Sequence, residues 1–167
     1  MRIAVHGIPQ PGLQVDLDLS KEWMRAAAEA VLEGQPHELK GQLDVQRGEN
    51  RRVNIIGVVR AAAAAICDRC GDPIERVIDT EVALSYLQHR DEVNADFELG
   101  VDDLDVGWYR NAHVDLSDVL REALALALPT RTLCLDSVGC DARTKALLVQ
   151  ESTEDTGHPA FAALREQ

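Results

Sequence analysis

Hydrophobic residues recur along the chain with two periods, one of two residues and one of three to four. The period of two predicts β-strands, because successive strand side chains point to opposite faces of a sheet. It runs through residues 3–8, 13–19, 39–45, 53–59 and 74–87, with a shorter segment near 106–109. The middle of the protein is therefore predicted to be an antiparallel meander of strands.

The run Ala61–Ala65 has no period of its own. Ala favours helix, but Val58 and Val59 lead into the run and a turn with two cysteines follows it. We therefore predict that the strand from residue 53 continues through these alanines. The residues Gly48–Asn50 are of the kind found in turns, so this strand is expected to form a hairpin with residues 39–45.

Two segments have the helical period. Residues 21–33 place Trp23, Val31 and several alanines on one side, with Ser20 as the expected N-cap and Gly34 as the stop. Residues 116–128 repeat Leu, Val and Ala at helical spacing, with Asp115 or Ser117 as the expected cap. Both segments are predicted to be amphipathic helices.

These elements predict an α+β fold. The expected sheet is antiparallel and strongly twisted or barrel-like, with the helices near 21–33 and 116–128 on its flanks. We predict one domain over residues 1–149, followed by a polar C-terminal tail, 150–167, with a short terminal helix near 159–164.

Composition and charge limit the classes of function. The chain has 167 residues and a net charge of −12, and residues 91–106 hold seven carboxylates without a Lys or Arg. Such a surface repels nucleic-acid phosphates and attracts basic proteins. The longest hydrophobic run, Ala61–Cys67, is too short for a membrane helix, and no secretory signal is predicted. We expect a cytoplasmic protein that does not bind membranes.

Four cysteines form the one constellation that indicates chemistry, namely Cys67 and Cys70 in a CxxC motif and Cys134 and Cys140 further on. In a reducing compartment, metal or redox chemistry is expected before disulfides. Gly71 allows the left-handed conformation in which backbone amides point at sulfur, as in a zinc knuckle. We predict a zinc site with these four ligands; free thiols are the alternative.

Catalytic motifs are not found in the sequence. It has no phosphate-binding glycine loop, nucleophile elbow or HExxH helix, and its five histidines lack metal spacing. Arg47, Arg51 and Arg52 lie together at the first hairpin and form a candidate contact for RNA or a protein partner. We predict a protein that is not an enzyme and that has no small-molecule substrate.

Three motifs give a resemblance to a known family. The segments 57–73 (ending CDRCGDP), 114–129 (VDLSDVLREALALALP) and 159–164 (PAFAAL) follow in the order seen in the YceD family. The chain resembles these large ribosomal RNA subunit accumulation proteins over residues 39–165. Many members carry a richer cysteine cluster after the Leu-Pro, where this chain has Cys134 and Cys140.

The resemblance implies a non-enzymatic ribosome-biogenesis factor that supports accumulation or maturation of large-subunit ribosomal RNA. The expected partner is that RNA or its precursor particle, reached through proteins. One alternative is a zinc-stabilised acidic module that acts as a chaperone for a basic ribosomal protein. Another is a thiol oxidoreductase, which Gly71-Asp72-Pro73 disfavours because a helix is not expected to start there.

Overall fold

The structure is a computed structural model, and it describes residues 1–89 and 106–152. The chain forms two compact units. The first contains Met1–Ala65 and Glu75–Thr130, and the second contains Ile66–Ile74 and the described chain from Arg131 onward. One domain over residues 1–149 stays a prediction, and the expected terminal helix near 159–164 lies outside the described residues.

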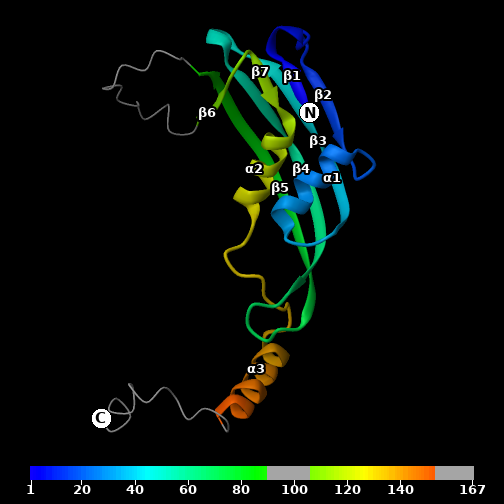
Figure 1. The fold of residues 1–167 in the computed structure, drawn as a ribbon, viewed down its shortest axis with the longest axis vertical. Coiled ribbons are helices and arrows are strands. Elements are labelled where there is room, and N and C mark those ends of the chain that lie inside the picture. Colours follow the sequence, from blue (N-terminus) through cyan, green and yellow to red (C-terminus); the bar gives the residue numbers. More distant parts are fainter. Residues whose placement is uncertain (90–105, 153–167) are drawn as a thin grey trace, which may run out of the picture. The chain divides into compact units, whose positions relative to one another are not determined.

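A five-stranded sheet is the centre of the first unit (Figure 1), in the order β2-β3-β4-β5-β6. Its strands are β2 (Leu13–Leu17), β3 (Pro36–Arg47), β4 (Val53–Ile66), β5 (Pro73–Gln88) and β6 (Val106–Tyr109). A separate pair joins β1 (Arg2–Ala4) to β7 (His113–Asp115). The predicted hairpin is confirmed, because β3 and β4 pair antiparallel from Arg47 and Val53 onward.

One strand departs from the expected antiparallel pattern. β6 pairs parallel to β5, with Ser85 opposite Val106 and Gln88 opposite Tyr109, so the sheet is open and mixed. Parallel neighbours need a connection of a dozen or more residues, and residues 89–105 provide that length. Most of this connection is the acidic segment 91–106, which lies outside the described residues apart from Val106.

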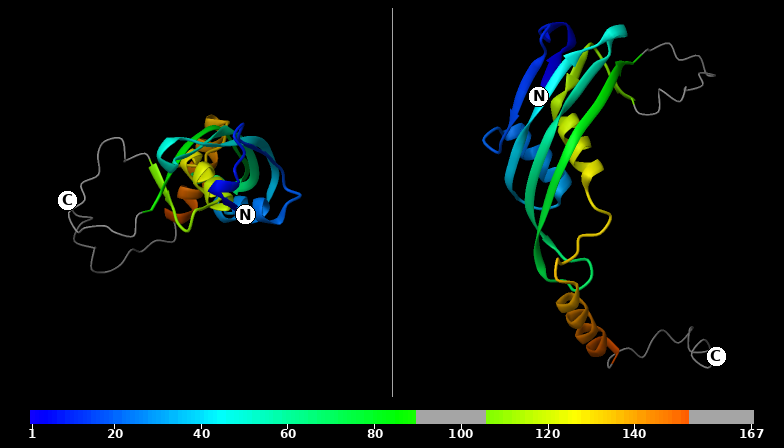
Figure 2. Two further views of the ribbon diagram at one scale, coloured as in Figure 1. Left: turned by 90° about the horizontal axis from the view of Figure 1, so that it is seen from above. Right: turned by 180° about the vertical axis from the view of Figure 1, so that it is seen from behind.

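Two helices cover one face of the sheet (Figure 2), α1 (Glu22–Leu32) and α2 (Leu116–Ala127). Their buried residues pack with the inward side chains of the strands in a single hydrophobic core. The α+β class and both flanking helices are thus confirmed. The short 3₁₀ helices Val5–Gly7 and Glu49–Arg51 complete the elements of this unit.

The alanine run lies in β4, as predicted. Ala61, Ala62 and Ala63 are almost fully buried, and Ala61 and Ala63 pair with Leu39 and Pro36 of β3. Successive residues of a strand point to opposite faces, so both faces of the sheet are covered at these alanines. Packing of the buried strand overrides the helix preference of Ala.

The start of the chain and of α1 differs from the expectation. The first strand ends at Ala4, because the chain then enters the turn Val5–Gly7. Ser20 does not cap α1, whose N-cap is Lys21. The Ser20 N–H instead donates to Asp18 Oδ1 at 2.7 Å, and its hydroxyl donates to the same oxygen. A local turn at Asp18 thus takes the side chain that would have capped the helix.

The buried face of α1 is also rotated from the expected one. Its buried residues are Met24, Ala27, Ala28 and Leu32, whereas Trp23 and Val31 pack at the border of the core. Glu33 ends the helix in the left-handed conformation, with φ 56°, one residue before the predicted stop at Gly34. In contrast, α2 is capped by Asp115, one of the two expected caps, which accepts the Ser117 N–H at 3.0 Å.

Asp115 predicts a pH dependence of stability. Burial alone would raise its pKa, but hydrogen bonds from Ser117, the N-terminal ammonium group and Arg2 lower the pKa to about 2. A carboxyl with a depressed folded-state pKa stabilises the fold fully above its unfolded value near 4, and this contribution is lost as the pH falls toward 2.

We expect Asp115→Ala to lower the free energy of unfolding by about 1–2 kcal/mol at pH 7, as for loss of an N-cap. The difference from wild type should shrink between pH 4 and pH 2, as measured by urea unfolding at each pH. The control is Asp118→Ala, because Asp118 lies on the same helix but is exposed and does not cap it. A difference that stays constant down to pH 2 contradicts this account.

Two glycines allow a close approach of β3 and β4. Gly41 has φ 147°, and a Cβ built there would lie 2.1 Å from the backbone oxygen of Val58. A Cβ at Gly57 would lie 2.0 Å from the backbone oxygen of Gln42. Both contacts involve backbone, which cannot move aside as a side chain can, so the two positions require glycine.

Candidate metal centre

The first pair of cysteines lies in the turn between β4 and β5. The Cys67 N–H donates to the Asp72 carbonyl at 2.8 Å, and the Gly71 N–H donates to the Cys67 carbonyl at 3.0 Å. Gly71 has φ 77° and nothing within 4 Å of a built Cβ, so its backbone conformation, rather than space, requires glycine. The predicted left-handed turn after Cys70 is confirmed.

A reciprocal contact fixes the chain that carries the second pair. The Asp68 N–H donates to the Thr132 carbonyl at 2.8 Å, and Asp68 Oδ2 accepts the Thr132 N–H at 2.6 Å. Both residues belong to the second unit. Thr132 is itself buried, and it holds the segment leading to Cys134 beside the CxxC turn.

Cys140 lies in the first turn of a helix that the sequence pattern did not predict, α3 (Ser137–Ser152). Asp136 Oδ1 accepts the Gly139 N–H at 3.0 Å, and the Asp136 carbonyl accepts the Cys140 N–H at 3.1 Å. Asp136 thus caps the helix and sets the position of Cys140. An aspartate directly before Ser137 was the signal that could have located this helix.

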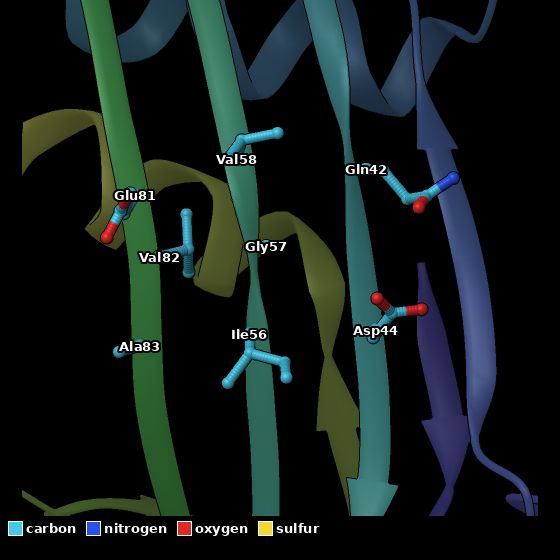
Figure 3. Close-up of a pocket in the computed structure, with 8 residues that line it drawn as sticks. All are labelled: Gln42, Asp44, Ile56, Gly57, Val58, Glu81, Val82 and Ala83. Carbon is cyan, nitrogen blue, oxygen red and sulfur yellow. The ribbon is translucent and has the colours of Figure 1, made fainter.

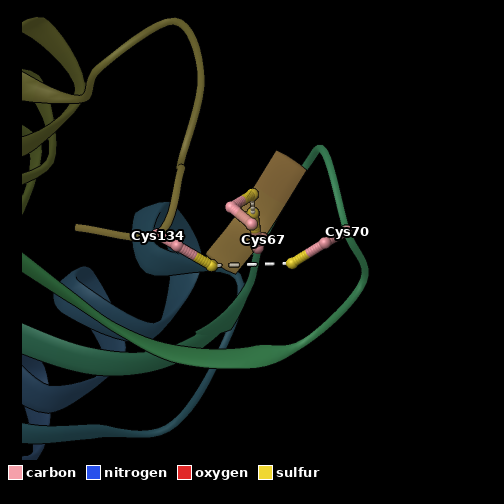
Figure 4. Close-up of side chains that lie close together, drawn as sticks. Cys67, Cys70 and Cys134 are labelled. Atoms are coloured by element: carbon pink, nitrogen blue, oxygen red, sulfur yellow. Dashed lines mark hydrogen bonds between the residues drawn. The ribbon is translucent and has the colours of Figure 1, made fainter. Parts of the chain in front are cut away.

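The four cysteines converge within the second unit, and Figure 4 labels three of them, Cys67, Cys70 and Cys134. Their Sγ atoms all lie within 4.8 Å of one another. Cys67 Sγ is 3.7 Å from Cys140 Sγ, and Cys70 Sγ is 3.5 Å from Cys134 Sγ. A tetrahedral zinc with Zn–S bonds of about 2.3 Å has S–S distances of about 3.8 Å. The sulfur positions therefore fit a tetrahedral metal site, and they are too far apart for disulfides.

Hydrogen bonds favour the thiolate form of the first pair. Backbone N–H groups of Cys70 and Arg69 donate to the Cys67 sulfur and lower the pKa of that thiol to about 6. The Asp72 N–H and the Arg143 side chain likewise lower the pKa of Cys70. Amides directed at sulfur are the feature of a zinc knuckle, and they stabilise thiolate charge whether it is free or bound to a metal.

The second pair has the opposite tendency. Burial raises the pKa of Cys134, and burial together with hydrogen bonding to Cys70 raises the pKa of Cys140 to about 12. Four thiolates at this spacing would repel one another, so Cys134 and Cys140 keep their protons until a cation replaces them. A bound divalent ion deprotonates such thiols, because its charge outweighs the burial.

Two arginines supply positive charge beside the sulfurs. Arg143 Nε lies 2.6 Å from Asp72 Oδ2, and Arg143 Nη2 donates to Cys134 Sγ at 3.5 Å. Arg69 forms an ion pair with Asp141. A zinc ion with four thiolates would carry a net charge of about −2, and Arg143 places a positive charge directly beside it. Arg143 was not recognised from the sequence, and its spacing of three from Cys140 is the signal that could have found it.

The candidate arginines Arg47, Arg51 and Arg52 lie in the first unit, at the turn between β3 and β4. Arg47 and Arg51 are exposed, and Arg52 is half-buried. Arg51 Nη1 donates to Gln88 Oε1 at 2.9 Å, and its carbonyl accepts the Tyr109 hydroxyl at 2.7 Å. The three residues lie in or directly beside this turn, which we call the arginine turn.

Comparisons with known proteins give one match. The family model described as Large ribosomal RNA subunit accumulation protein YceD matches residues 55–166. The match includes all four cysteines and begins after the arginine turn. Neither the curated proteins nor the solved structures contain a match. Among the described residues, no helix has the length and hydrophobicity needed to cross a membrane.

Proposed function

Since the chain belongs to the YceD family of large ribosomal RNA subunit accumulation proteins, we propose that it is a non-enzymatic ribosome-biogenesis factor. In this role it supports the accumulation or maturation of large-subunit ribosomal RNA. The family match over residues 55–166 is the observation that carries the proposal. A cytoplasmic location fits it, because the cytoplasm keeps cysteines reduced and able to bind metal.

We further propose that Cys67, Cys70, Cys134 and Cys140 bind one Zn²⁺. The support is a set of four sulfur ligands at tetrahedral spacing, with amide donors on two of them. Four protein ligands leave no position for water or substrate, which is typical of structural rather than catalytic zinc. The ion would join the CxxC turn to α3, and its chemistry would be confined to holding these segments together.

The alternative of a thiol oxidoreductase is not favoured. Reactive CxxC motifs commonly begin a helix, whose N-terminus lowers the thiol pKa. Here the motif lies between β4 and β5. The low pKa of Cys67 arises from amides of its own turn. The same amides suit a metal thiolate, so the lowered pKa needs no redox role.

For RNA contact, the arginine turn is our candidate surface. The chain carries a net charge of −12, so most of its surface repels phosphate. Three arginines on one hairpin tip would give a small local contact in this acidic surround. The contact would add to binding through proteins of the precursor particle.

The proposed function predicts that the protein sediments with precursor large subunits. We expect the variant with Arg47, Arg51 and Arg52 all changed to Ala to associate more weakly. In a plot of log affinity against log salt concentration, the slope should become less steep. The change should correspond to the loss of up to about three phosphate contacts. Sucrose gradients of growing cells, followed by binding of purified particles over a salt series, measure both effects.

A variant with Lys21, Arg25 and Arg121 changed to Ala has the same change of charge and is the control. Wild type that stays at the top of the gradient contradicts the proposed function. Equal association of the arginine-turn variant and wild type leaves the function in place and excludes this turn as the RNA contact.

A further inference from the structure

The face of the five-stranded sheet opposite the two helices has exposed hydrophobic residues at its centre. Ile56 and Val58 of β4 expose 48% and 52% of their surfaces. Figure 3 shows them on the side of the sheet away from the helical ribbons, where parts of β3, β4 and β5 line a shallow hollow. We call this surface the outer face.

Polar and acidic groups flank these two residues. In the register of the β3–β4 pair, Asp44 is opposite Ile56 and Gln42 is opposite Val58. Gln42 Nε2 donates to Asp16 Oδ1 on β2 at 2.9 Å, which extends the acidic side of the hollow. Glu81 lines the hollow from β5, on the other side of β4. Carboxylates therefore lie on both sides of a hydrophobic centre.

The cations of the outer face are already paired. Lys40 Nζ lies 2.9 Å from Glu38 Oε1, and Arg60 Nη1 lies 3.1 Å from Asp79 Oδ2. Within residues 1–89 and 106–152, no Lys or Arg lines the hollow, and neither Asp44 nor Glu81 forms an ion pair. The hollow thus combines uncovered hydrophobic surface with negative charge that has no ion-pair partner.

We propose that the outer face binds a basic segment of another protein. Hydrophobic side chains of that segment contact Ile56 and Val58, while its Lys or Arg residues lie against Asp44 and Glu81. Hydrophobic contact gives affinity, and opposite charge selects the partner and speeds association. This inference goes beyond the zinc site and the arginine turn, and it rests on the proposed function only for the choice of probe.

Two other occupants fit the outer face poorly. RNA would bring phosphates against the carboxylates and gain nothing from Ile56 and Val58. A second copy of the chain, packed through the same face, would bring Asp44 and Glu81 against other carboxylates. A basic protein alone satisfies both the hydrophobic and the acidic part of the hollow.

The first probe is the protein fraction of large ribosomal subunits, from which the RNA has been removed. The second probe, tested separately, is large-subunit RNA free of protein. We expect immobilised wild type to retain one or a few basic proteins from the protein fraction, identified by mass spectrometry. Ile56→Thr with Val58→Thr should lower the retained amount at least tenfold at every salt concentration. Asp44→Asn with Glu81→Gln should slow association several-fold at low salt, and this difference should fade as salt rises.

The control variant, Glu29→Gln with Leu126→Gln, changes exposed residues on the two helices and should bind as wild type does. Thermal unfolding of every variant shows whether the fold is kept. Equal retention by wild type and the outer-face variants, retention of RNA in place of protein, or self-association abolished by the Thr pair would each overturn the inference. Sedimentation of wild type with precursor subunits tests the proposed function separately.

Discussion

Substitution of Cys140 by Ser is expected to abolish zinc binding and to unfold the second unit. Serine is a poor zinc ligand, and the three remaining sulfurs leave the tetrahedron open. Cys140 Sγ is buried and lies 3.7 Å from Cys67 Sγ. The substitution thus places a hydroxyl in a buried hydrophobic cluster formed by the cysteines and Ile74. A unit this small depends on such a link.

Removal of the metal by a chelator should have the same effect as the substitution. A ligand present at a thousand times its Kd stabilises the folded form by about 4 kcal/mol, and we expect at least that loss for the second unit. Metal analysis should find about one zinc per wild-type chain. Hydrogen exchange resolved by segment should show α3 losing protection while α2 keeps its own.

Lys145→Ser, an exposed change on the same helix, is the control for helix propensity and should keep the zinc. Wild type purified without chelator that holds less than about 0.2 zinc per chain, with four titratable thiols, contradicts the metal proposal. Protection of α3 that is insensitive to chelation would show that the segments are held by protein contacts alone.

Substitution of Gly41 by Ala should be the most damaging single change in the sheet. The added Cβ would lie 2.1 Å from the Val58 carbonyl oxygen, and φ at this position is 147°. The clash and the backbone strain together should lower the free energy of unfolding by about 2–4 kcal/mol. Denaturant unfolding followed by circular dichroism measures it.

Gly7→Ala is the matched control, since its built Cβ has its nearest neighbour at 4.0 Å. Its free energy of unfolding should stay within about 1 kcal/mol of wild type. Equal unfolding midpoints for Gly41→Ala, Gly7→Ala and wild type would show that β3 and β4 separate at this point without cost.

The pattern of hydrophobic and polar residues was sufficient to predict those helices and strands that bury one face. The β3–β4 hairpin, α2 and its Asp115 cap follow directly from residue periodicity and capping chemistry. The parallel β6 could not be predicted in this way, because strand direction depends on how a long connection runs. In α3, polar and hydrophobic residues alternate without a consistent helical face, so periodicity carried no signal and only Asp136 marked its start.

The candidate site divides in the same manner. The ligand types and the Gly71 turn could be predicted, because a CxxC motif imposes its own local geometry. The pairing of Cys67 with Cys140 and of Cys70 with Cys134 is set by contacts between segments more than 60 residues apart. The contact of Arg143 with Cys134 depends on the same tertiary arrangement, which no local pattern specifies.

The order of the cysteines along the chain has a consequence for synthesis. Cys67 and Cys70 leave the ribosome long before Cys134 and Cys140, and the first unit ends at Thr130, before either late cysteine. Domains generally fold as units in the order in which they emerge. On a nascent chain, the CxxC turn is therefore a half-site that holds two of the four sulfur ligands. The cluster is complete only once the segment that carries Cys134 and Cys140 has emerged.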